Sequence, residues 1–564
     1  MEKYIVESKN GKFAYLNNSP IAYFCTEFGV EESLPIFAGG LGILAGDLLL
    51  EAGKQGLPFV GVGLFYHYSF AIHVPGQDVV LNGEEKLDPA KAGFSILKDA
   101  GEDFLIGVEV GERIIYARTW TKVYGSAHLF LLDTDIEINN KEDRDITGYL
   151  YHHNMEAKLL QELVLGIGGV KLLRRLGIVP SIYHLNEGHT SFAALAIAVE
   201  YTHDHPETHS LASAIDEVKK NIVASKHTVL PASGVFFSKE QFSGVLDKYL
   251  DRHNVDYNEF FVMGKSDTDG GWFSSTRFLI QSIIRGNAVS ILHAAFEKKV
   301  HPHSPLFGIT NGVNVDRWRS KDWPNSPAKE ATDEILLAFK TKKRKELIDL
   351  VRQKTGAELD PNAMTIVWAR RFAPYKRPDL IFSDLERLVN IFESKEGPMQ
   401  IILAGNASYD NEEGKVLLDK ILGLIFDPRL KGRAVYLPGY SIDMAHVLIE
   451  GADVWLNTPI RGKEACATSG MKAALNGTLQ LSTSDGWIEE VEWADKGWVL
   501  PAEDTANNLY EILEKEVVPA FYRKSEGVAM EWASKMRNMA DRAESYYTTD
   551  RMLNEYLEKL YFPK

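Results

Sequence analysis

The chain has 564 residues, 45% of them hydrophobic, which is enough for two or more domains with sizeable cores. Its 62 basic and 78 acidic residues give a net charge of −16, which argues against nucleic acid or an anionic membrane as the main partner. The two cysteines cannot form a disulfide framework, and the segment after Met1 has no apolar signal core, so we expect a cytoplasmic protein. No membrane span is predicted, because glycines and Asp47 interrupt the longest apolar stretch, residues 36–50.

The first elements alternate between strands and helices. Strands are predicted at residues 21–28 and 57–64, and between them the turn Gly39-Gly40-Leu41-Gly42 leads into an amphipathic helix at 44–54. The start of a helix presents free N–H groups and a positive dipole to an anion. The same glycines would also suit a tight turn without a ligand, and this signal alone does not separate the two readings.

Further along, strands are predicted at 104–108, 114–117 and 128–132, followed by a long helical stretch at 154–176. A strand at 182–186 then runs into Glu187-Gly188-His189. Polar groups at the carboxyl end of a strand in an open α/β sheet are where ligands usually bind.

Histidines elsewhere in this half carry a weaker signal. His227 fits either a structural residue or a ligand contact. The histidine-rich run at 201–209 is interrupted by Pro206, and we interpret it as a solvated loop. We predict no metal site.

A polar stretch rich in proline, serine and aspartate follows Trp318 and extends to Asp333, and we place a domain boundary near it. Strands and helices alternate again between residues 364 and 457, which predicts a second doubly wound α/β unit. Two amphipathic helices are predicted near the end, at 527–543 and 552–561.

The first strand of this second unit runs into a basic segment, residues 369–377, with four cations and no acidic residue. Charges directly after a buried strand are costly without counter-anions. An exposed basic loop is one interpretation, but the bidentate geometry of guanidinium groups favours a phosphate site.

Residues 464–472, written Glu-Ala-Cys-Ala-Thr-Ser-Gly-Met-Lys, follow a buried strand at 452–457 and lead into a helix. Lys472 lies between Met471 and Ala473, and desolvation there would lower its pKa and make its amine a nucleophile able to form a Schiff base. The alternative is a lysine that extends to solvent from an ordinary helix.

Six segments in this order resemble the α-glucan (glycogen, starch or maltodextrin) phosphorylases, and the resemblance extends from about Ile21 to Trp498. They are residues 37–42, 185–189, 227–231, 310–313, 370–377 and 464–472. The resemblance implies an α/β fold with two Rossmann-like domains that face a cleft, the GT-B glycosyltransferase architecture. The implied domains are residues 1–310 and 311–545, with a final helix at 546–564 that packs back on the first domain.

The resemblance also implies a reaction. Inorganic phosphate would release a terminal α-1,4-linked glucose from a glucan as α-glucose 1-phosphate, with retention, and pyridoxal phosphate on Lys472 would take part through its phosphate. The implied partners are α-glucan or maltooligosaccharide, inorganic phosphate and glucose 1-phosphate. Whether the chain forms a homo-oligomer stays open.

Roles for individual residues come from the same resemblance. The implied catalytic and phosphate-binding groups are Arg371, Lys376, His227 and the backbone of Gly40. The implied cofactor contacts are Lys472, Arg370, Lys376, Trp318, Tyr440 and Thr468. The implied substrate contacts are Asn311, Glu464, Cys466, Ala467, Glu187 and His189, with Glu27 as an addition.

Cys466 and Ala467 depart from the family pattern, which usually has serine and glycine there. A glycine-like position suggests that Ala467 takes a left-handed conformation, which would cost alanine about 1 to 2 kcal/mol. Two rival functions remain: a sugar-nucleotide glycosyltransferase of the same architecture without pyridoxal phosphate, and a degenerate homologue that only binds glucan. Lys472 argues against the first, and the intact Arg371 and Lys376 argue against the second.

Overall fold

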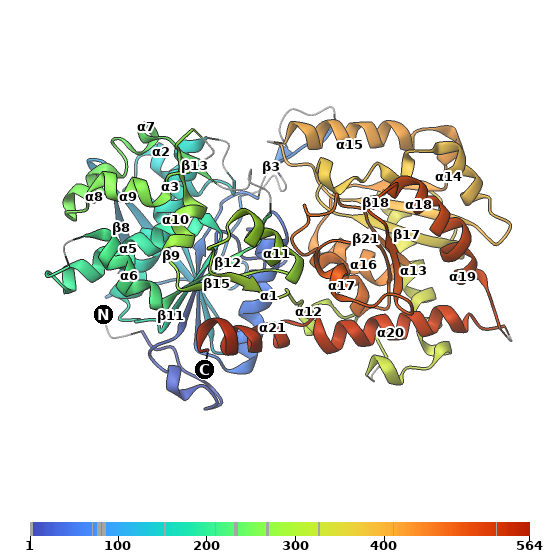
Figure 1. Ribbon diagram of the computed structural model, residues 1–564, viewed down its shortest axis with the longest axis horizontal. Helices are drawn as coiled ribbons and strands as arrows, with labels where there is room; N and C mark the ends of the chain where they lie inside the picture. The colour runs from blue at the N-terminus through green and yellow to red at the C-terminus, as the bar shows by residue number, and fades with distance from the viewer. Residues whose placement is uncertain are drawn as a thin grey trace.

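The computed structural model describes residues 4–69, 71–75, 80–81, 86–151, 154–208, 210–229, 235–266, 270–324, 327–409, 411–525 and 527–563. Leu230 and Pro231 of the 227–231 segment, and His209 of the histidine-rich run, lie outside these residues. Two large sheets lie at opposite ends of the molecule's long axis (Figure 1), and each has its own buried hydrophobic cluster. The prediction of an α/β fold is confirmed.

The first sheet has the strand order β16-β15-β12-β11-β1-β2-β10-β9-β5, with β8 paired to β9. From β16 to β10 every pair is parallel, while β9 pairs antiparallel with β10, β8 and β5. The strands are β1 (Ile21–Phe24), β2 (Phe59–Leu64), β5 (Ser95–Ile96), β8 (Leu105–Val110), β9 (Arg113–Tyr124), β10 (Ala127–Asp133), β11 (Ile182–Asn186), β12 (Ile222–Lys226), β15 (Arg285–Ala288) and β16 (Leu306–Gly308). Central strands such as β2 are buried throughout because helices cover both faces.

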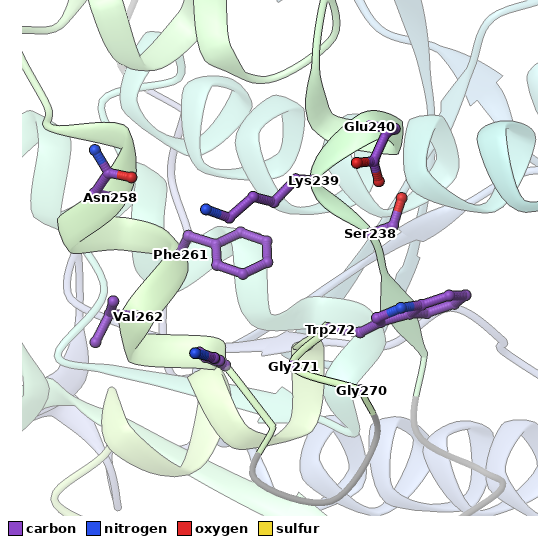
Figure 2. A pocket seen from close by; sticks show the side chains of 10 residues that line it. Ser238, Lys239, Glu240, Asn258, Phe261, Val262, Gly270, Gly271 and Trp272 are labelled. Atoms are coloured by element: carbon purple, nitrogen blue, oxygen red, sulfur yellow. The ribbon is translucent and has the colours of Figure 1, made fainter.

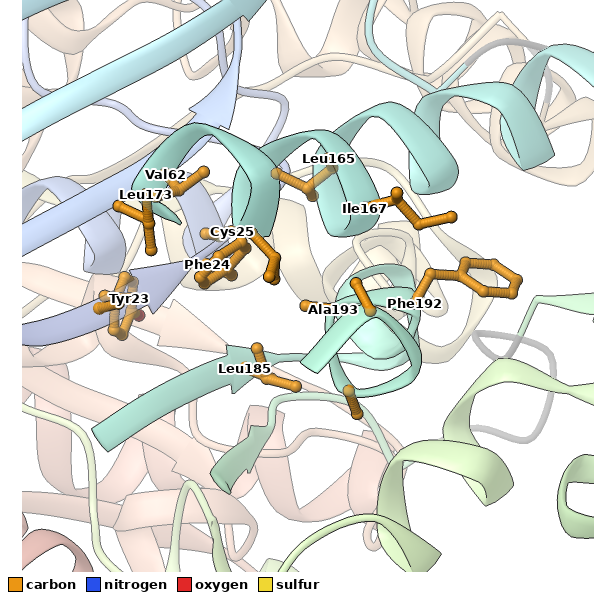
Figure 3. Close-up of a cluster of buried hydrophobic side chains, with 14 of the residues drawn as sticks. Tyr23, Phe24, Cys25, Val62, Leu165, Ile167, Leu173, Leu185, Phe192 and Ala193 are labelled. Atoms are coloured by element: carbon orange, nitrogen blue, oxygen red, sulfur yellow. The ribbon is translucent and has the colours of Figure 1, made fainter. Parts of the chain in front are cut away.

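The helices of this half are α1 (Gly40–Gln55), α2 (Lys141–Arg144), α3 (Met155–Leu163), α4 (Gly169–Arg175), α5 (Ser191–Asp204), α6 (Leu211–Val218), α7 (Lys239–Phe242), α8 (Asp247–Arg252), α9 (Tyr257–Gly264), α10 (Ser275–Gln281) and α11 (Ile291–Val300). The helical stretch predicted at 154–176 is confirmed as α3 and α4, joined by the π-helical segment η3 (Val164–Gly168). Figure 3 shows how Leu165 and Ile167 of η3 and Phe192 of α5 join Phe24 of β1 in the core. A β-carbon on Gly166 would lie 2.6 Å from the backbone nitrogen of Ala193, so the close approach of η3 and α5 requires glycine.

The second sheet is entirely parallel, in the order β19-β18-β17-β20-β21-β22. Its strands are β17 (Met364–Ala369), β18 (Met399–Ala404), β19 (Ala434–Leu437), β20 (Val454–Asn457), β21 (Leu479–Thr483) and β22 (Gly497–Leu500). Its helices include α14 (Leu385–Phe392), α15 (Glu412–Ile425), α16 (Ile442–Gly451), α17 (Thr468–Leu475), α18 (Thr505–Ile512) and α19 (Val518–Tyr522). The predicted alternation is confirmed, but the 23-residue helix α13 (Asp333–Thr355) was not predicted.

The end of the chain contacts both cores. Helix α20 (Met530–Tyr546) packs in the second core, whereas Met552 and Tyr556, from α21 (Thr549–Glu555) and η13 (Tyr556–Tyr561), are buried in the first. The hydroxyl of Tyr561 lies 2.8 Å from Nδ1 of His184 on β11. None of the helices in the described part of the chain is long and apolar enough to cross a membrane.

The strand orders explain where the predicted site residues lie. In the first sheet the order in which strands are added reverses at β1, which lies between β2 and β11. In the second sheet it reverses at β17, which lies between β18 and β20. Ligands of open α/β sheets bind at the carboxyl ends of strands next to such reversals. Glu27 and Glu187 follow β1 and β11, and Arg370 and Glu464 follow β17 and β20.

Candidate active site

Glu464 lies between two cations of the basic segment. Its Oε1 is 2.8 Å from Nη2 of Arg370, and its Oε2 is 2.8 Å from Nζ of Lys376. Burial raises the pKa of the Glu464 carboxyl, but the charges of Arg370 and Lys376 outweigh burial and bring that pKa down to about 2. The counter-anion that the basic segment lacks locally is therefore supplied by the loop after β20.

The other two cations of the segment differ from each other. Arg377 donates to the carbonyls of Thr458 and Pro459, at 2.8 and 2.9 Å. Arg371 is exposed, and its guanidinium has no hydrogen bond or ion pair with any residue in the described part of the chain. Arg371 thus leaves its bidentate donors available for an anion.

Lys472 lies on α17 with only 9% of its surface exposed. Its Nζ is 3.7 Å from the centre of the Trp318 ring, on α12 (Val315–Trp318). Burial lowers the pKa of the Lys472 amine to about 7, with Asp47 opposing this shift and Arg317 adding to it. The amine is therefore buried rather than a surface charge, and a lowered pKa of this kind is what a nucleophilic lysine needs.

Two helices begin at the same place. A β-carbon built on Gly40, the first residue of α1, would lie 3.9 Å from Oγ1 of Thr468, the first residue of α17. Glu27 holds the turn before α1 by accepting hydrogen bonds from the backbone of Ala38 and Gly39, at 2.8 and 3.2 Å. The first residues of the two helices thus lie close together, and the first turn of a helix has backbone N–H groups without a partner in the helix, which can bind an anion.

Glu187 supports the loop that carries His227. It has φ +61°, and its Oε1 accepts from the backbone N–H of His227 at 2.6 Å and from the Thr228 hydroxyl at 2.8 Å. Nε2 of His227 lies 2.9 Å from Oδ1 of Asn186. Burial lowers the pKa of His227 to about 3, so its imidazole is neutral at physiological pH.

His189 lies beside the residues that hold Glu27. Its ring is 5.9 Å from that of Tyr151, whose hydroxyl donates to Oε1 of Glu27 at 2.5 Å. Burial lowers the pKa of His189 to about 4, so this ring is also neutral. The residues predicted after β1 and β11 are thus connected through Tyr151.

Asn311 and the loop before α17 meet between the two sheets. Oδ1 of Asn311 is buried and has no hydrogen-bond partner within the residues that the structure describes, so it can accept from a ligand. The Asn311 carbonyl accepts from Nη2 of Arg551 at 3.0 Å. Cys466 is 4% exposed, and burial raises its thiol pKa, which keeps the thiol protonated. Ala467 has φ +73°, so its expected left-handed conformation is confirmed.

Tyr440 follows β19 and is half-buried. Burial raises the pKa of Tyr440 to about 12, and the nearby charge of Arg370 opposes this shift. The phenol therefore stays protonated beside the cations of the basic segment.

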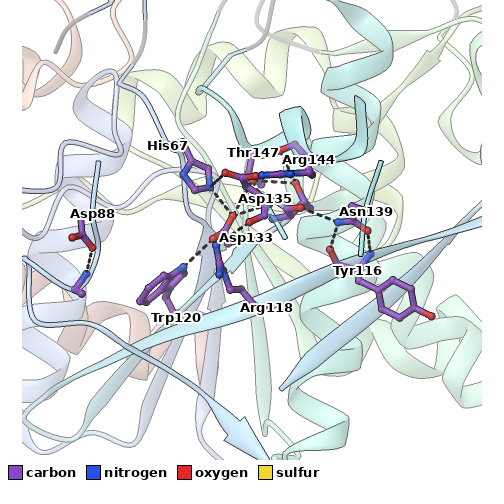
Figure 4. A network of polar contacts seen from close by, with 12 residues as sticks. His67, Asp88, Tyr116, Arg118, Trp120, Asp133, Asp135, Asn139, Arg144 and Thr147 are labelled. Atoms are coloured by element: carbon purple, nitrogen blue, oxygen red, sulfur yellow. Dashed lines mark hydrogen bonds and ion pairs between the residues drawn. The ribbon is translucent and has the colours of Figure 1, made fainter. Parts of the chain in front are cut away.

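Sequence reasoning missed two buried carboxylates and the groups around them. Asp47 was noticed only as a charge that interrupts an apolar stretch, but it is 1% exposed and accepts from Nε1 of Trp318 at 2.7 Å. A carboxylate within an apolar helix could have signalled this, because a buried charge needs partners. The second feature is centred on Asp133 at the end of β10, which accepts from Nε2 of His67 at 2.7 Å and from Arg118 Nε at 2.9 Å (Figure 4).

A surface pocket lies away from these residues. Figure 2 shows it between α7, α9 and the turn at 270–272, with Lys239, Phe261 and Trp272 among its lining side chains. Its cavity volume is about 380 Å³. No predicted site residue lines it.

Comparisons with known proteins find a matching family and several similar enzymes. The profile of the carbohydrate phosphorylase family matches residues 324–497. A maltodextrin phosphorylase of Thermococcus litoralis is 34% identical, over 96% of this chain and 70% of its own length. Glycogen phosphorylases of Aquifex aeolicus and Mycobacterium tuberculosis are each 31% identical, over 98% and 96% of this chain and 88% and 71% of their own lengths.

The fold and the relatives define an enzyme of the glycosyltransferase class. The chain belongs to the carbohydrate phosphorylase family, and the resemblance found in the sequence is confirmed.

Proposed function

We propose that this chain is an α-glucan phosphorylase: it transfers a terminal α-1,4-linked glucosyl unit from a glucan to inorganic phosphate and releases α-glucose 1-phosphate with retention. The observation that carries the proposal is that α1 and α17 begin close together, at Gly40 and Thr468. Helix α17 also holds the buried amine of Lys472. An anion site and a reactive lysine on neighbouring turns suit a phosphate acceptor and an aldehyde cofactor.

Pyridoxal phosphate fits the residues present. Lys472 would hold its aldehyde, the Trp318 ring lies against that amine, and the start of α17 at Thr468 offers backbone donors for its phosphate. Arg370, Lys376 and Tyr440 would surround it, since Arg370 and Lys376 are paired with Glu464 and Tyr440 lies near the charge of Arg370. When bound, the cofactor supplies a phosphate that donates and accepts a proton next to the substrate phosphate.

The chain's own residues would bind and orient the attacking phosphate. Arg371, which has no polar partner among the described residues, offers a bidentate fork, Lys376 a point charge, and Gly40 a backbone N–H at a helix start. Donors fixed in this way stabilise the charge on phosphate as the glycosidic bond breaks.

Glu464 does not act as the general acid in this proposal. Its pKa of about 2 keeps it ionised, and both of its oxygens are held in ion pairs. The paired carboxylates of a glycosidase are therefore not required. Glu464 instead positions Arg370 and Lys376.

The sugar would bind between Asn311 and His227. The buried, unpartnered Oδ1 of Asn311 can accept from a sugar hydroxyl, and Cys466 and Ala467 line the same loop. Neutral His227 can exchange hydrogen bonds without adding charge. Glu187, His189 and Glu27 are assigned to the glucan side.

A division into domains 1–310 and 311–545 with a returning helix at 546–564 belongs to the proposal. It is supported by the two sheets with separate cores and by the burial of Met552 and Tyr556 in the first core.

Borohydride reduction followed by peptide mass mapping tests the cofactor assignment. The expected result is a pyridoxyl adduct on Lys472 alone. Fully active protein with unmodified Lys472 would contradict it, and transfer from a sugar nucleotide without any adduct would favour the rival glycosyltransferase. Glucan binding without an adduct or turnover would favour the degenerate homologue.

A further inference from the structure

Asp47 makes contacts that connect the two halves of the molecule. It lies on α1, which packs on the first sheet, and is 1% exposed. Its Oδ2 accepts from Nε1 of Trp318 at 2.7 Å and from the backbone N–H of Asn314 at 3.1 Å, and its Oδ1 accepts from Nη1 of Arg317 at 3.1 Å. All of these donors belong to the segment that precedes the second sheet.

Trp318 links Asp47 to Lys472, because it contacts both residues. Its indole is 1% exposed, with its N–H fixed by Asp47 and its ring centre 3.7 Å from Nζ of Lys472. The ring of His446 on α16 stacks on the same indole, with ring centres 4.8 Å apart, and the guanidinium carbon of Arg317 lies 5.1 Å from the indole's centre. A hydrogen bond that fixes the ring also fixes the surface that the ammonium contacts, since cation–π attraction depends on the ammonium lying over the ring face.

We propose that Asp47 is a positioning residue for Lys472: it holds the Trp318 ring against the amine and, as a buried carboxylate, stabilises the protonated amine from the opposite half of the molecule. The effect of Asp47 on the Lys472 amine does not depend on the proposed function. Its importance for catalysis does, because it rests on the proposed role of Lys472. In that role, the contact between the halves would set how readily the lysine is deprotonated.

Among the described residues, three charged or titratable groups face Lys472. From α1 it is Asp47, from α12 Arg317, and from α16 His446. Arg317 opposes protonation of the amine, and its own ion pair with Asp47 at 3.1 Å partly offsets this. Burial lowers the pKa of His446, so at neutral pH it adds little charge, and Asp47 is the anion that supports the ammonium.

The test is the pH dependence of Lys472 acetylation in the full chain without added cofactor. Acetic anhydride reacts with neutral amines only, so the rate at each pH, followed by peptide mass spectrometry, gives the midpoint of the Lys472 titration. The variants are Asp47→Asn and Asp47→Glu. Glu51→Gln is the matched control, because Glu51 lies on the same helix, is also buried, and contacts Asn314 rather than Trp318.

Asp47→Asn should lower the Lys472 midpoint by about one pH unit, which corresponds to a roughly tenfold larger neutral fraction on the acidic side. Asp47→Glu keeps the charge and should restore the midpoint, and Glu51→Gln should leave it unchanged. A purely structural role would change the limiting rate through accessibility without moving the midpoint, and that result in folded Asp47→Asn would overturn the proposal.

If Asp47→Asn does not fold, Trp318→Phe decides. It keeps an aromatic ring but removes the N–H that Asp47 holds, so the midpoint should again fall, and an unchanged midpoint would overturn the proposal. Because no cofactor is involved, this failure is distinct from a missing pyridoxyl adduct on Lys472.

Discussion

Gly40 is the first residue of α1, in the half with the first sheet, and Thr468 is the first residue of α17, in the half with the second. A β-carbon on Gly40 would lie 3.9 Å from the Thr468 hydroxyl oxygen. Such a carbon would make only an ordinary van der Waals contact, so the protein itself tolerates a side chain there. In the proposed function the space beside Gly40 holds phosphate, because the first turns of two neighbouring helices favour an anion.

Gly40→Ala separates these explanations. Alanine in the first turn of α1 should raise stability by about 0.5 to 1 kcal/mol, because it restricts the unfolded chain, yet its methyl group would occupy the proposed phosphate position. We expect KM for phosphate to rise about tenfold or more while the thermal midpoint does not fall. Gly423→Ala on α15, where a β-carbon would meet nothing within 4 Å, is the control and should change only stability. Equal kinetics for both variants would remove Gly40 from the site.

Arg371→Lys tests the free guanidinium. The variant keeps the charge but loses the bidentate fork, so kcat/KM should fall by about tenfold or more, which is about 1.4 kcal/mol of transition-state stabilisation. Stability should not change, because Arg371 has no polar partner in the described part of the chain. Arg523→Lys, an exposed residue paired with Glu531, serves as the control. Wild-type kinetics in the Arg371 variant would show that phosphate binds elsewhere.

The strands and helices that carry the site could be predicted from the sequence, but the contacts between residues on its opposite sides could not. The strand, loop and helix around 454–475 follow from a buried apolar run and a polar loop, and β20 and α17 lie where they were predicted. Helix α13 was missed because its charged residues resemble a linker, although Lys340 is buried and donates to the carbonyls of Glu450 and Asn476.

Ion pairs and hydrogen bonds between residues that are distant in the chain could not be predicted either. The basic segment showed that a counter-anion was needed, but not that Glu464 supplies it. The function of Asp47 depends on how α1 packs against Trp318, which no local pattern encodes. Local propensity thus predicted the elements, while the pairing of buried charges required the tertiary structure.

Glu464→Gln should destabilise the protein and change its response to acid. Removing the carboxylate leaves Arg370 and Lys376 as uncompensated buried charges, at a cost of about 3 to 5 kcal/mol. Because the pKa of Glu464 is lowered from 4.5 to about 2 in the folded state, its stabilising effect is present above pH 4.5 and is lost as pH falls toward 2.

Denaturant unfolding at several pH values below neutrality measures this effect. The wild type should lose stability between pH 4.5 and 3 more steeply than Glu464→Gln. Glu514→Gln, which breaks the more exposed pair with Arg387, should cost less than about 1 kcal/mol. Identical acid dependence in wild type and Glu464→Gln would mean that the ion pairs do not hold in solution.

Ala467→Gly should stabilise the loop before α17. Alanine at φ +73° is strained and glycine is not, so the free energy of unfolding should rise by about 1 kcal/mol. Ala100→Gly, at φ +50° in a surface turn, is a control that should gain similar stability without any change in kinetics.

The double change Cys466→Ser with Ala467→Gly addresses sugar specificity. We expect the ratio of kcat/KM between glucosyl substrates and their epimeric or deoxy analogues to change, because pocket contacts act through differential binding of the transition state. Phosphorolysis itself should persist. Unchanged ratios across the analogue series would place this loop outside the sugar pocket.

The most direct test is to incubate the purified chain, supplied with pyridoxal phosphate, with a maltooligosaccharide and inorganic phosphate, and to assay the products. The proposed function predicts α-glucose 1-phosphate and a glucan shortened by one unit, formed only when phosphate is present and absent in Lys472→Ala. The proposal would be contradicted by release of free glucose or by product formation by Lys472→Ala at the wild-type rate. It would also be contradicted if folded protein with pyridoxal phosphate on Lys472 showed no turnover.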